Sequence, residues 1–349
     1  MRGLFSFILI MCYNIRMQGL EISKNFYREF GEKMLTEQFG DILPKLAIGL
    51  VGSGSECFMY DDKISTDHDF DPGFLIFVPD EFDDDIIFKI NRAYSKLPRG
   101  YMGYERAIMS PVGGNRRGVK KISDFLLEKT GTKDGNLSYY DFLKIPEESL
   151  AELVNGEIWR DDSKVFTNIR IKLATFPEDV KLKKLAGEIL IMAQSGQYNF
   201  ERCIAHNEFG AARLAAFEFV NAALHAAFLL NEVYMPYYKW KFRAFRDLYW
   251  PKNYVVKSDL NKIDGIEDET FFKIPFEQIL ESILTITDER LFTNAIQTDI
   301  SKIANAFVER LTYEKLTSRN DKYLEPHAYE VNNKIKDNEL RNMHILAGV

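Results

Sequence analysis

The chain has 349 residues, enough for one large domain or two ordinary ones. Apolar residues make up 46% and charged residues 28%, the balance of a globular protein with ample material for a core. The net charge of −7 argues against a general nucleic-acid binder, which usually presents a basic face, although a local basic groove stays compatible with it. Cys12, Cys57 and Cys203 have neither metal-ligand nor disulfide spacing, which suits a reducing cytoplasm.

The N-terminus begins with an apolar run, GLFSFILIMCY, directly after Arg2. The run is too short to span a bilayer, and no small-residue cleavage site follows it. We therefore interpret residues 1–16 as an extension upstream of a functional start at Met17, with an export signal as the alternative. Apolar spacing then predicts a surface helix over 21–39 with Ser23 as its N-cap. We expect no other segment to cross a membrane.

Three short segments predict strands. KLAIGLVG is an apolar run stopped by glycines, and GFLIFVP, at residues 73–79, is a second run rich in aromatic and branched residues. Residues 80–150 contain turn signals and predict short helices and loops. GEIWRDD, at residues 156–162, predicts a third strand, and VFTNIRIKL begins another element.

Long helices are predicted after Pro177. DVKLKKLAGEILIMAQSG carries its apolar residues on one helical face. Residues 208–232 form a segment that is apolar over much of a helix circumference, which indicates the centre of a bundle. Further helices are expected at 274–285 and 288–312.

The fold class is therefore expected to be α+β, with a small mixed-sheet domain followed by an α-helical bundle domain. The expected boundaries place the first domain at residues 17–175 and the second at 176–315. Residues 316–349 are expected to be a polar C-terminal tail.

The chemistry is concentrated in GLVGSGSECFMYDDKISTDHDFDPGFLIFV. Asp67 and Asp69 introduce the second strand, and strand alternation places both carboxylates on one face. Such a pair can share hard divalent cations, above all magnesium bridged to phosphates. The glycines before Ser55 allow close backbone approach and an anion-binding nest, and a helix starting just after Ser55 would direct its N-terminus at the same charge. Together these parts predict phosphoryl-group chemistry.

Gly54-Ser55, eleven intervening residues and then Asp67-His68-Asp69 resemble the signature of the polymerase-β-like nucleotidyltransferase superfamily. The region from Met17 to about Tyr249 further resembles a prokaryotic branch of it that is catalogued only as a domain of unknown function. GLVGSGSECFMYDDKISTDHDF, NGEIWRDD, MAQSGQYNFER and YMPYYKWKFRAF carry that resemblance. The two-domain layout also resembles kanamycin nucleotidyltransferase in architecture.

The resemblance implies a nucleotidyltransferase domain followed by a helical substrate or acceptor domain. It also implies a third carboxylate on a later strand, which serves as a metal ligand or general base. Asp161 in GEIWRDD is the best match, and Asp162 is the next. Ser55 and Gly54 would bind the nucleotide phosphates, with Ser53 as an alternative because the doubled Gly-Ser leaves the register open.

Other residues are open to two interpretations. His68 stands where the superfamily usually has an apolar residue, and alternation predicts that it faces away from the metals as a structural histidine. Lys239 and Arg243, spaced i and i+4, are expected to share a helix face that binds a triphosphate or anionic acceptor; a solvated face is the alternative. Gln197 and Tyr198 either line a cleft or make hydrogen bonds between helices.

We therefore predict a cytoplasmic, magnesium-dependent enzyme that transfers AMP from ATP to a hydroxyl or similar nucleophile and releases pyrophosphate. Asp67, Asp69 and Asp161 would hold two magnesium ions. The expected partners are a nucleoside triphosphate and an unidentified small-molecule or protein acceptor, since fold does not fix substrate. The alternatives are a regulatory or toxin–antitoxin enzyme that adenylylates a protein, and a non-catalytic nucleotide sensor of the same fold. The net charge disfavours a third, a tRNA-end transferase.

Overall fold

The computed structural model describes residues 18–62, 71–106, 116–248, 250, 276–285 and 289–349. Asp67, His68 and Asp69 therefore lie outside the described residues, as does the expected extension at 1–16. The chain divides into two compact units, each of which is described by itself below. The first comprises Met1–Asn136 and Glu152–Leu173, and the second comprises Leu137–Ala151 and Ala174–Val349. The expected α+β class is confirmed, but residues 137–151 belong to the helical unit.

The first unit is built on a four-stranded mixed sheet with the strand order β5-β2-β1-β6. β1 is antiparallel to both β2 and β6, whereas β2 and β5 are parallel. The bounds are β1 Ala47–Leu50, β2 Leu75–Val78, β5 Gly118–Lys121 and β6 Glu157–Asp161. Three of these strands were predicted: β1 and β2 from apolar runs, and β6 from GEIWRDD. β5, with the sequence GVKK, lies in the stretch expected to hold only helices and loops, because one valine gives no strand pattern.

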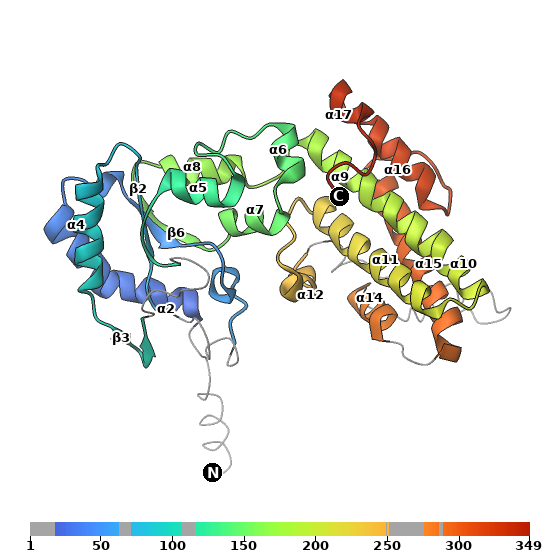
Figure 1. Cartoon of the computed structure of the whole chain (residues 1–349), viewed down its shortest axis with the longest axis horizontal. Coiled ribbons are helices and arrows are strands. Elements are labelled where there is room, and N and C mark those ends of the chain that lie inside the picture. The colour runs from blue at the N-terminus through green and yellow to red at the C-terminus, as the bar shows by residue number, and fades with distance from the viewer. Residues whose placement is uncertain (1–17, 63–70, 107–115, 249, 251–275, 286–288) are drawn as a thin grey trace, which may run out of the picture. The chain divides into compact units, whose positions relative to one another are not determined.

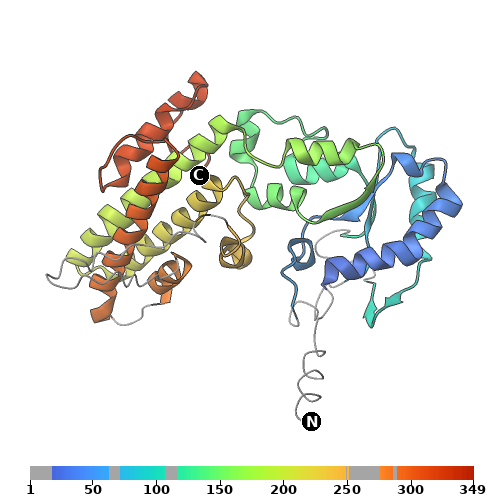
Figure 2. The ribbon, with the colours of Figure 1, turned by 180° about the vertical axis from the view of Figure 1, so that it is seen from behind.

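Helices cover one face of this sheet from the N-terminal side of the chain (Figure 2). The stretch expected to be one helix is α2 (Gly19–Phe26), a π-helical turn at 27–31 and α3 (Glu32–Phe39). Gly31 lets this stretch approach the sheet, since a Cβ there would lie 2.4 Å from the Phe74 ring. Ser23 is not the N-cap, because α2 begins four residues earlier; Ser23 is buried inside the helix.

The opposite face of the sheet is covered by α5 (Ile122–Thr130) and α8 (Val165–Lys172) (Figure 1). The rings of Phe77 and Phe166 have their centroids 4.2 Å apart, and those of Phe77 and Phe125 are 5.2 Å apart. All three rings are buried, so truncating one to alanine is expected to cost about 3–5 kcal/mol of stability. A strand residue on the same side of the sheet as Phe77 therefore points toward α5 and α8.

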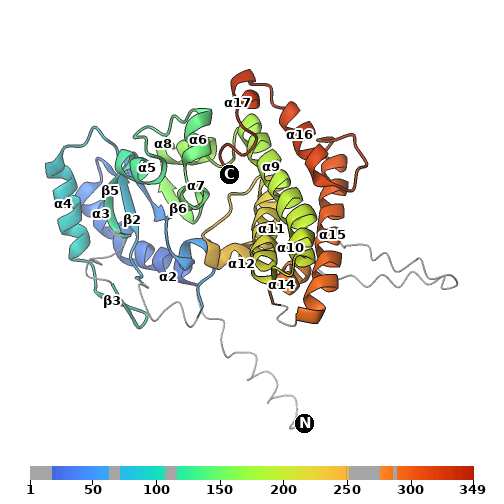
Figure 3. The same ribbon diagram turned by 45° about the vertical axis from the view of Figure 1, so that its right-hand side comes forward.

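The second unit is a helical bundle in which α11 and α16 pack along α9 (Figure 3). α11 is, among the described residues, a helix long and apolar enough to cross a membrane by length and composition, which the sequence analysis did not expect. Within its most apolar stretch 61% is buried in the protein, as in the core helix of a bundle. The longer helices are α9 Glu178–Met192, α11 Phe209–Leu230, α14 Phe276–Thr285, α15 Glu289–Tyr313 and α16 Leu324–Asn333.

Residues 316–349, expected to be a polar tail, instead pack onto the bundle through α16 and α17 (Asn338–Asn342). Two buried lysines of α9 hold this segment. The Lys183 ammonium donates to the Met343 carbonyl at 2.8 Å, and the Lys184 ammonium donates to the Gly348 carbonyl at 2.8 Å. Polar composition concealed the packing because the apolar residues of α16 occupy only one face.

Candidate functional site

The glycine–serine turn directly follows β1. Gly52 and Gly54 have φ angles of +104° and +135°, which side chains rarely adopt. A Cβ on Gly54 would also lie 2.6 Å from Oε1 of Glu56. Ser55 then begins a single 3₁₀ turn, Ser55–Phe58, where a helix start was expected. The backbone at both glycines therefore has a conformation that favours glycine, and phosphate binding at this turn stays a prediction.

Asn155 and Gly156 hold the turn from the neighbouring chain segment. The Asn155 side chain makes two hydrogen bonds with Gly52: its Nδ2 donates to the carbonyl at 2.8 Å, and its Oδ1 accepts from the N–H at 2.8 Å. Gly156 N–H donates to the Cys57 carbonyl at 2.9 Å. A Cβ on Gly156 would lie 2.0 Å from the Leu50 carbonyl oxygen, so only glycine fits there. The sequence analysis missed Asn155, although it lies directly before the predicted third strand.

A buried ion pair fixes the chain on both sides of residues 63–70. The Arg117 guanidinium lies 2.6 Å from the Glu56 carboxylate and 3.4 Å from the Asp71 carbonyl oxygen. Burial lowers the pKa of Arg117, but the charges of Glu56 and Asp71, with the Glu56 hydrogen bond and Cys57, together outweigh burial and raise it, so the guanidinium stays charged. Asp71 is buried and accepts from the Gly73 N–H at 2.6 Å. Arg117 thus links the 3₁₀ turn that contains Glu56 to Asp71, the first described residue after 63–70.

The structure does not bring Asp161 to the glycine–serine turn. Asp161 is the register partner of Ala47, at the start of β1, whereas the turn follows the end of β1. Ala47 in turn pairs with Phe77, so Asp161 points to the face covered by α5 and α8. Its carboxylate accepts hydrogen bonds from the Thr167 N–H at 2.8 Å and the Ser163 hydroxyl at 3.0 Å. Asp161 therefore caps the first turn of α8.

Asp162, the second choice, is also occupied elsewhere. Its carboxylate lies 2.6 Å from the guanidinium of Arg160, and the residue is exposed.

The carboxylate beside the turn is that of Glu157. Leu50, the last residue of β1, pairs with Glu157 in the antiparallel register. A bulge between Ile48 and Gly49 brings β6 close, and a Cβ on Gly49 would lie 2.2 Å from the Glu157 carbonyl oxygen. Oε2 of Glu157 accepts from the Lys24 ammonium at 2.8 Å and from the Trp159 indole N–H at 3.1 Å. The signal that identifies Glu157 is the antiparallel pairing of its strand, β6, with β1, the strand that leads into the turn.

At this end of the sheet the carboxylate of Glu157 is the described group that could contribute to a site for a hard divalent cation. Among the described residues, no three His, Cys, Asp or Glu side chains are placed to share a metal ion, and Asp67 and Asp69 fall outside that set. Glu157 supplies a carboxylate oxygen, the type of ligand that magnesium prefers. This carboxylate already binds one positive group, the Lys24 ammonium.

The two basic residues of YMPYYKWKFRAF belong to the helical unit. Lys239 lies in a 3₁₀ turn, Tyr238–Trp240, with its ammonium 4.6 Å from the centre of the Trp240 ring. Arg243 lies in the following helix, α12 (Lys241–Phe245). The expected common α-helical face is therefore interrupted between them.

Gln197 and Tyr198 make contacts between helices. Gln197 accepts from the Leu324 N–H at 2.8 Å at the start of α16, and the Tyr198 ring stacks on Tyr323. These contacts agree with the second of the two interpretations made from the sequence.

His225 lies at the centre of a buried ionic cluster in the helical unit. Its Nδ1 is 2.5 Å from the Glu188 carboxylate, and its Nε2 contacts Glu147. Glu147 also accepts from the Met235 N–H at 2.9 Å. Burial lowers the pKa of His225, but the two carboxylates outweigh burial and raise it to about 9, so the imidazole is charged at neutral pH. The cluster links α9 and α11 to the start of α7 (Glu147–Val154).

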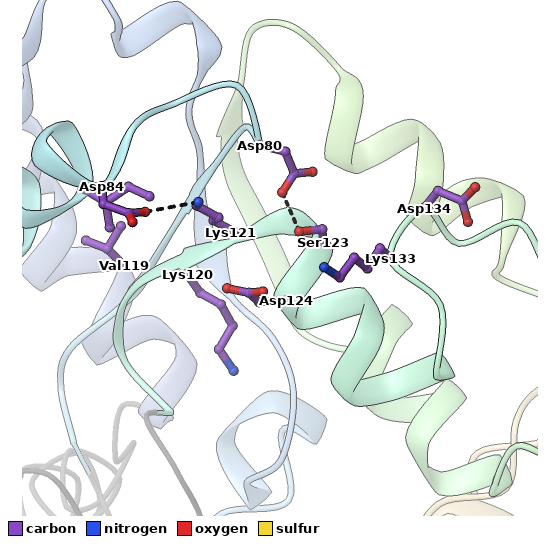
Figure 4. A pocket seen from close by; sticks show the side chains of 10 residues that line it. Asp80, Asp84, Val119, Lys120, Lys121, Ser123, Asp124, Lys133 and Asp134 are labelled. Carbon is purple, nitrogen blue, oxygen red and sulfur yellow. Dashed lines mark hydrogen bonds and ion pairs between the residues drawn. The ribbon is translucent and has the colours of Figure 1, made fainter.

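A hollow of about 680 Å³ lies in the first unit, at the end of the sheet opposite to the glycine–serine turn (Figure 4). It is lined by residues that follow β2 and by the end of β5, which are distant in register from the turn after β1. Asp80 accepts from the Ser123 hydroxyl, and Lys121 lies 3.2 Å from Asp84. Its charged groups largely neutralise one another, so this hollow is not the candidate site.

Comparison with known proteins gives a family match in the middle of the chain. Residues 142–241 match a family described as a domain of unknown function (DUF4037). No curated protein matches the chain. A crystal structure of a nucleotidyltransferase-like protein from Exiguobacterium sibiricum is 8% identical, covers 83% of this chain and 81% of its own, and has a TM-score of 0.33. The family match confirms, over residues 142–241, the resemblance to a domain of unknown function that the sequence segments indicated.

Proposed function

We propose that this chain is a magnesium-dependent nucleotidyltransferase that transfers AMP from ATP to a hydroxyl or similar nucleophile. The observation that carries the proposal is the meeting of two features at one edge of the sheet. The turn with Gly52 and Gly54 at positive φ follows β1, and the carboxylate of Glu157 lies on the strand paired to β1. The chain then leads from this turn into the segment with Asp67 and Asp69, and Arg117 contacts Glu56 in the turn and Asp71 directly after the segment.

Each residue has a role that its chemistry suits. Gly54 and Ser55, with Ser53 as the alternative, would hold the triphosphate through backbone N–H groups and a hydroxyl. Asp67 and Asp69 would hold two magnesium ions together with Glu157, which takes the place proposed for Asp161. When bound, magnesium would polarise the phosphate under attack and neutralise the leaving pyrophosphate.

The reaction is a displacement at the α-phosphorus. The acceptor oxygen forms a bond to phosphorus while the bond from phosphorus to the bridging oxygen of pyrophosphate breaks. The acceptor proton passes to a carboxylate, for which Glu157 is the available base, or to solvent. The helical unit would select the acceptor, and the exposed Lys239 and Arg243 are the cations it offers to an anionic one.

The decisive experiment supplies each nucleoside triphosphate, labelled at the α-phosphate, with magnesium and fractions of cell extract. Transfer of label to a small molecule supports the proposal, and transfer to a protein supports the alternative of a protein-adenylylating enzyme. Asp67→Asn and Asp69→Asn keep the side-chain shape but remove charge, so each is expected to slow transfer by at least about 10³-fold, or about 4 kcal/mol of barrier.

A sensor would behave differently. Tight ATP binding by the wild-type protein, with no pyrophosphate released for any nucleotide or fraction, would replace the enzyme by a nucleotide-binding module.

A further inference from the structure

The ion pair between Lys24 and Glu157 joins the N-terminal helix to the candidate site. The Lys24 ammonium lies 2.8 Å from Oε2 of Glu157, and the two side chains are 25% and 45% exposed. α2 is placed by its first residue, since the Gly19 N–H donates to Oδ2 of Asp61 at 2.8 Å. Asp61 follows the 3₁₀ turn of the glycine–serine segment. The same stretch of chain therefore sets both the turn and the position of Lys24.

The geometry leaves half of the Glu157 carboxylate available. Oε2 accepts from Lys24 and from Trp159, whereas Oε1 has no hydrogen-bond partner among the described residues. Both members of the ion pair are accessible to solvent, so a ligand can reach them. Partly exposed ion pairs contribute little to stability, so fold maintenance gives a weak reason for the pair.

We infer that Lys24 is a displaceable counter-ion of the active site. It neutralises Glu157 when no divalent cation is bound, and it transfers to a phosphate of the substrate when a cation takes the carboxylate. This inference rests on the proposed function, and it adds Lys24 as a substrate-binding residue.

Charge balance supports the exchange. In the absence of metal, the Glu157 carboxylate carries a negative charge, and the Lys24 ammonium at 2.8 Å neutralises it. Two magnesium ions only offset the charge of ATP and leave the charge of the carboxylate ligands, so an ammonium on a flexible four-carbon stem remains a suitable partner for a phosphate oxygen. The transfer involves no covalent step.

Manganese binding, measured by the electron paramagnetic resonance of free Mn²⁺, tests the first step, in which Lys24 competes with a divalent cation for Glu157. Lys24→Met is expected to tighten Mn²⁺ binding by about fivefold to tenfold, since a competing charge has gone. The gain should disappear in a Glu157→Gln background. Lys120→Met is the matched control, because the pair of Lys120 with Glu128 has similar exposures of 20% and 50%; its Mn²⁺ affinity should stay at the wild-type value.

Binding of tripolyphosphate in the presence of Mn²⁺ tests the second step, the transfer of Lys24 to a phosphate. The measurement does not depend on which nucleobase the protein prefers. Lys24→Met is expected to weaken tripolyphosphate binding by about fivefold, and Lys24→Arg is expected to restore most of it. Lys24→Gln, which keeps a hydrogen-bond donor, replaces Lys24→Met if that variant does not fold.

The outcomes separate the two proposals. If the wild-type protein binds Mn²⁺ and Glu157→Gln weakens that binding, but Lys24→Met changes neither affinity, the counter-ion inference is overturned and the proposed function stands. If the wild-type protein binds no Mn²⁺ with or without tripolyphosphate, both are overturned.

Discussion

The two acids at opposite ends of β6 should respond to mutation in opposite ways. Glu157→Gln removes the charge beside the glycine–serine turn, and we expect it to slow nucleotidyl transfer by about 10³-fold, equivalent to about 4 kcal/mol of barrier. Its stability should change by less than about 1 kcal/mol, because the ion pair with Lys24 that it loses is partly exposed. Asp161→Ala should leave the transfer rate of the folded protein within about threefold of wild type, since Asp161 points to the other face.

The cost of Asp161→Ala falls on stability instead. Asp161 is 4% exposed and accepts two hydrogen bonds, one of them from a backbone N–H in the first turn of α8. Losing such a cap and leaving its donors buried costs about 1–3 kcal/mol.

Both quantities can be measured on the same preparations. Pyrophosphate release reports transfer, and urea unfolding followed by circular dichroism reports stability. A well-folded Asp161→Ala protein that is inactive, alongside an active Glu157→Gln protein, would restore Asp161 to the site and refute the argument from register.

The remaining predictions concern the turn, its support and the buried histidine. Gly54→Ala should weaken ATP binding in equilibrium titration, because its Cβ meets Glu56; Gly131→Ala, strained but with open space around it, should bind ATP as wild type does. Asn155→Ala should lower the free energy of unfolding by about 1–3 kcal/mol, and an unchanged urea midpoint would contradict that. The pKa of His225 is raised from about 6.5 to about 9, so its contribution of roughly 3 kcal/mol is complete below pH 6.5 and is lost as pH rises through 9. Urea midpoints should therefore fall over that range, less steeply for Glu188→Gln; parallel slopes would refute the assignment.

The pattern of apolar residues along the sequence predicted those helices and strands that are buried on one face or on all sides. KLAIGLVG and GFLIFVP are continuous apolar runs because β1 and β2 are central strands buried on both faces. α11 was predicted from its nearly uniform apolarity, which its central packing in the bundle explains.

Elements that depend on distant partners escaped prediction. β5 is polar in sequence and forms because the ladder of β2 satisfies its backbone. The C-terminal segment was expected to be a polar tail, yet two buried lysines of α9 donate to its carbonyl groups. Serine is a common N-cap residue, which is why Ser23 was chosen. The helix instead begins at Gly19, whose N–H donates to the carboxylate of Asp61, 42 residues away in the sequence.

The third carboxylate depends on strand pairing, which one segment does not show. GEIWRDD offers three acids, and the resemblance was matched to Asp161, with Asp162 next. The strand that enters the glycine–serine turn runs antiparallel to β6, so the edge of the sheet at the turn meets the beginning of β6 and not its end. The bulge opposite Gly49 then changes the parity between Glu157 and Asp161, four residues apart, and directs them to opposite faces. Neither the pairing direction nor the bulge can be seen from one strand alone, whereas the glycines that permit the close approach, Gly49 and Gly156, were present in the sequence at both sites.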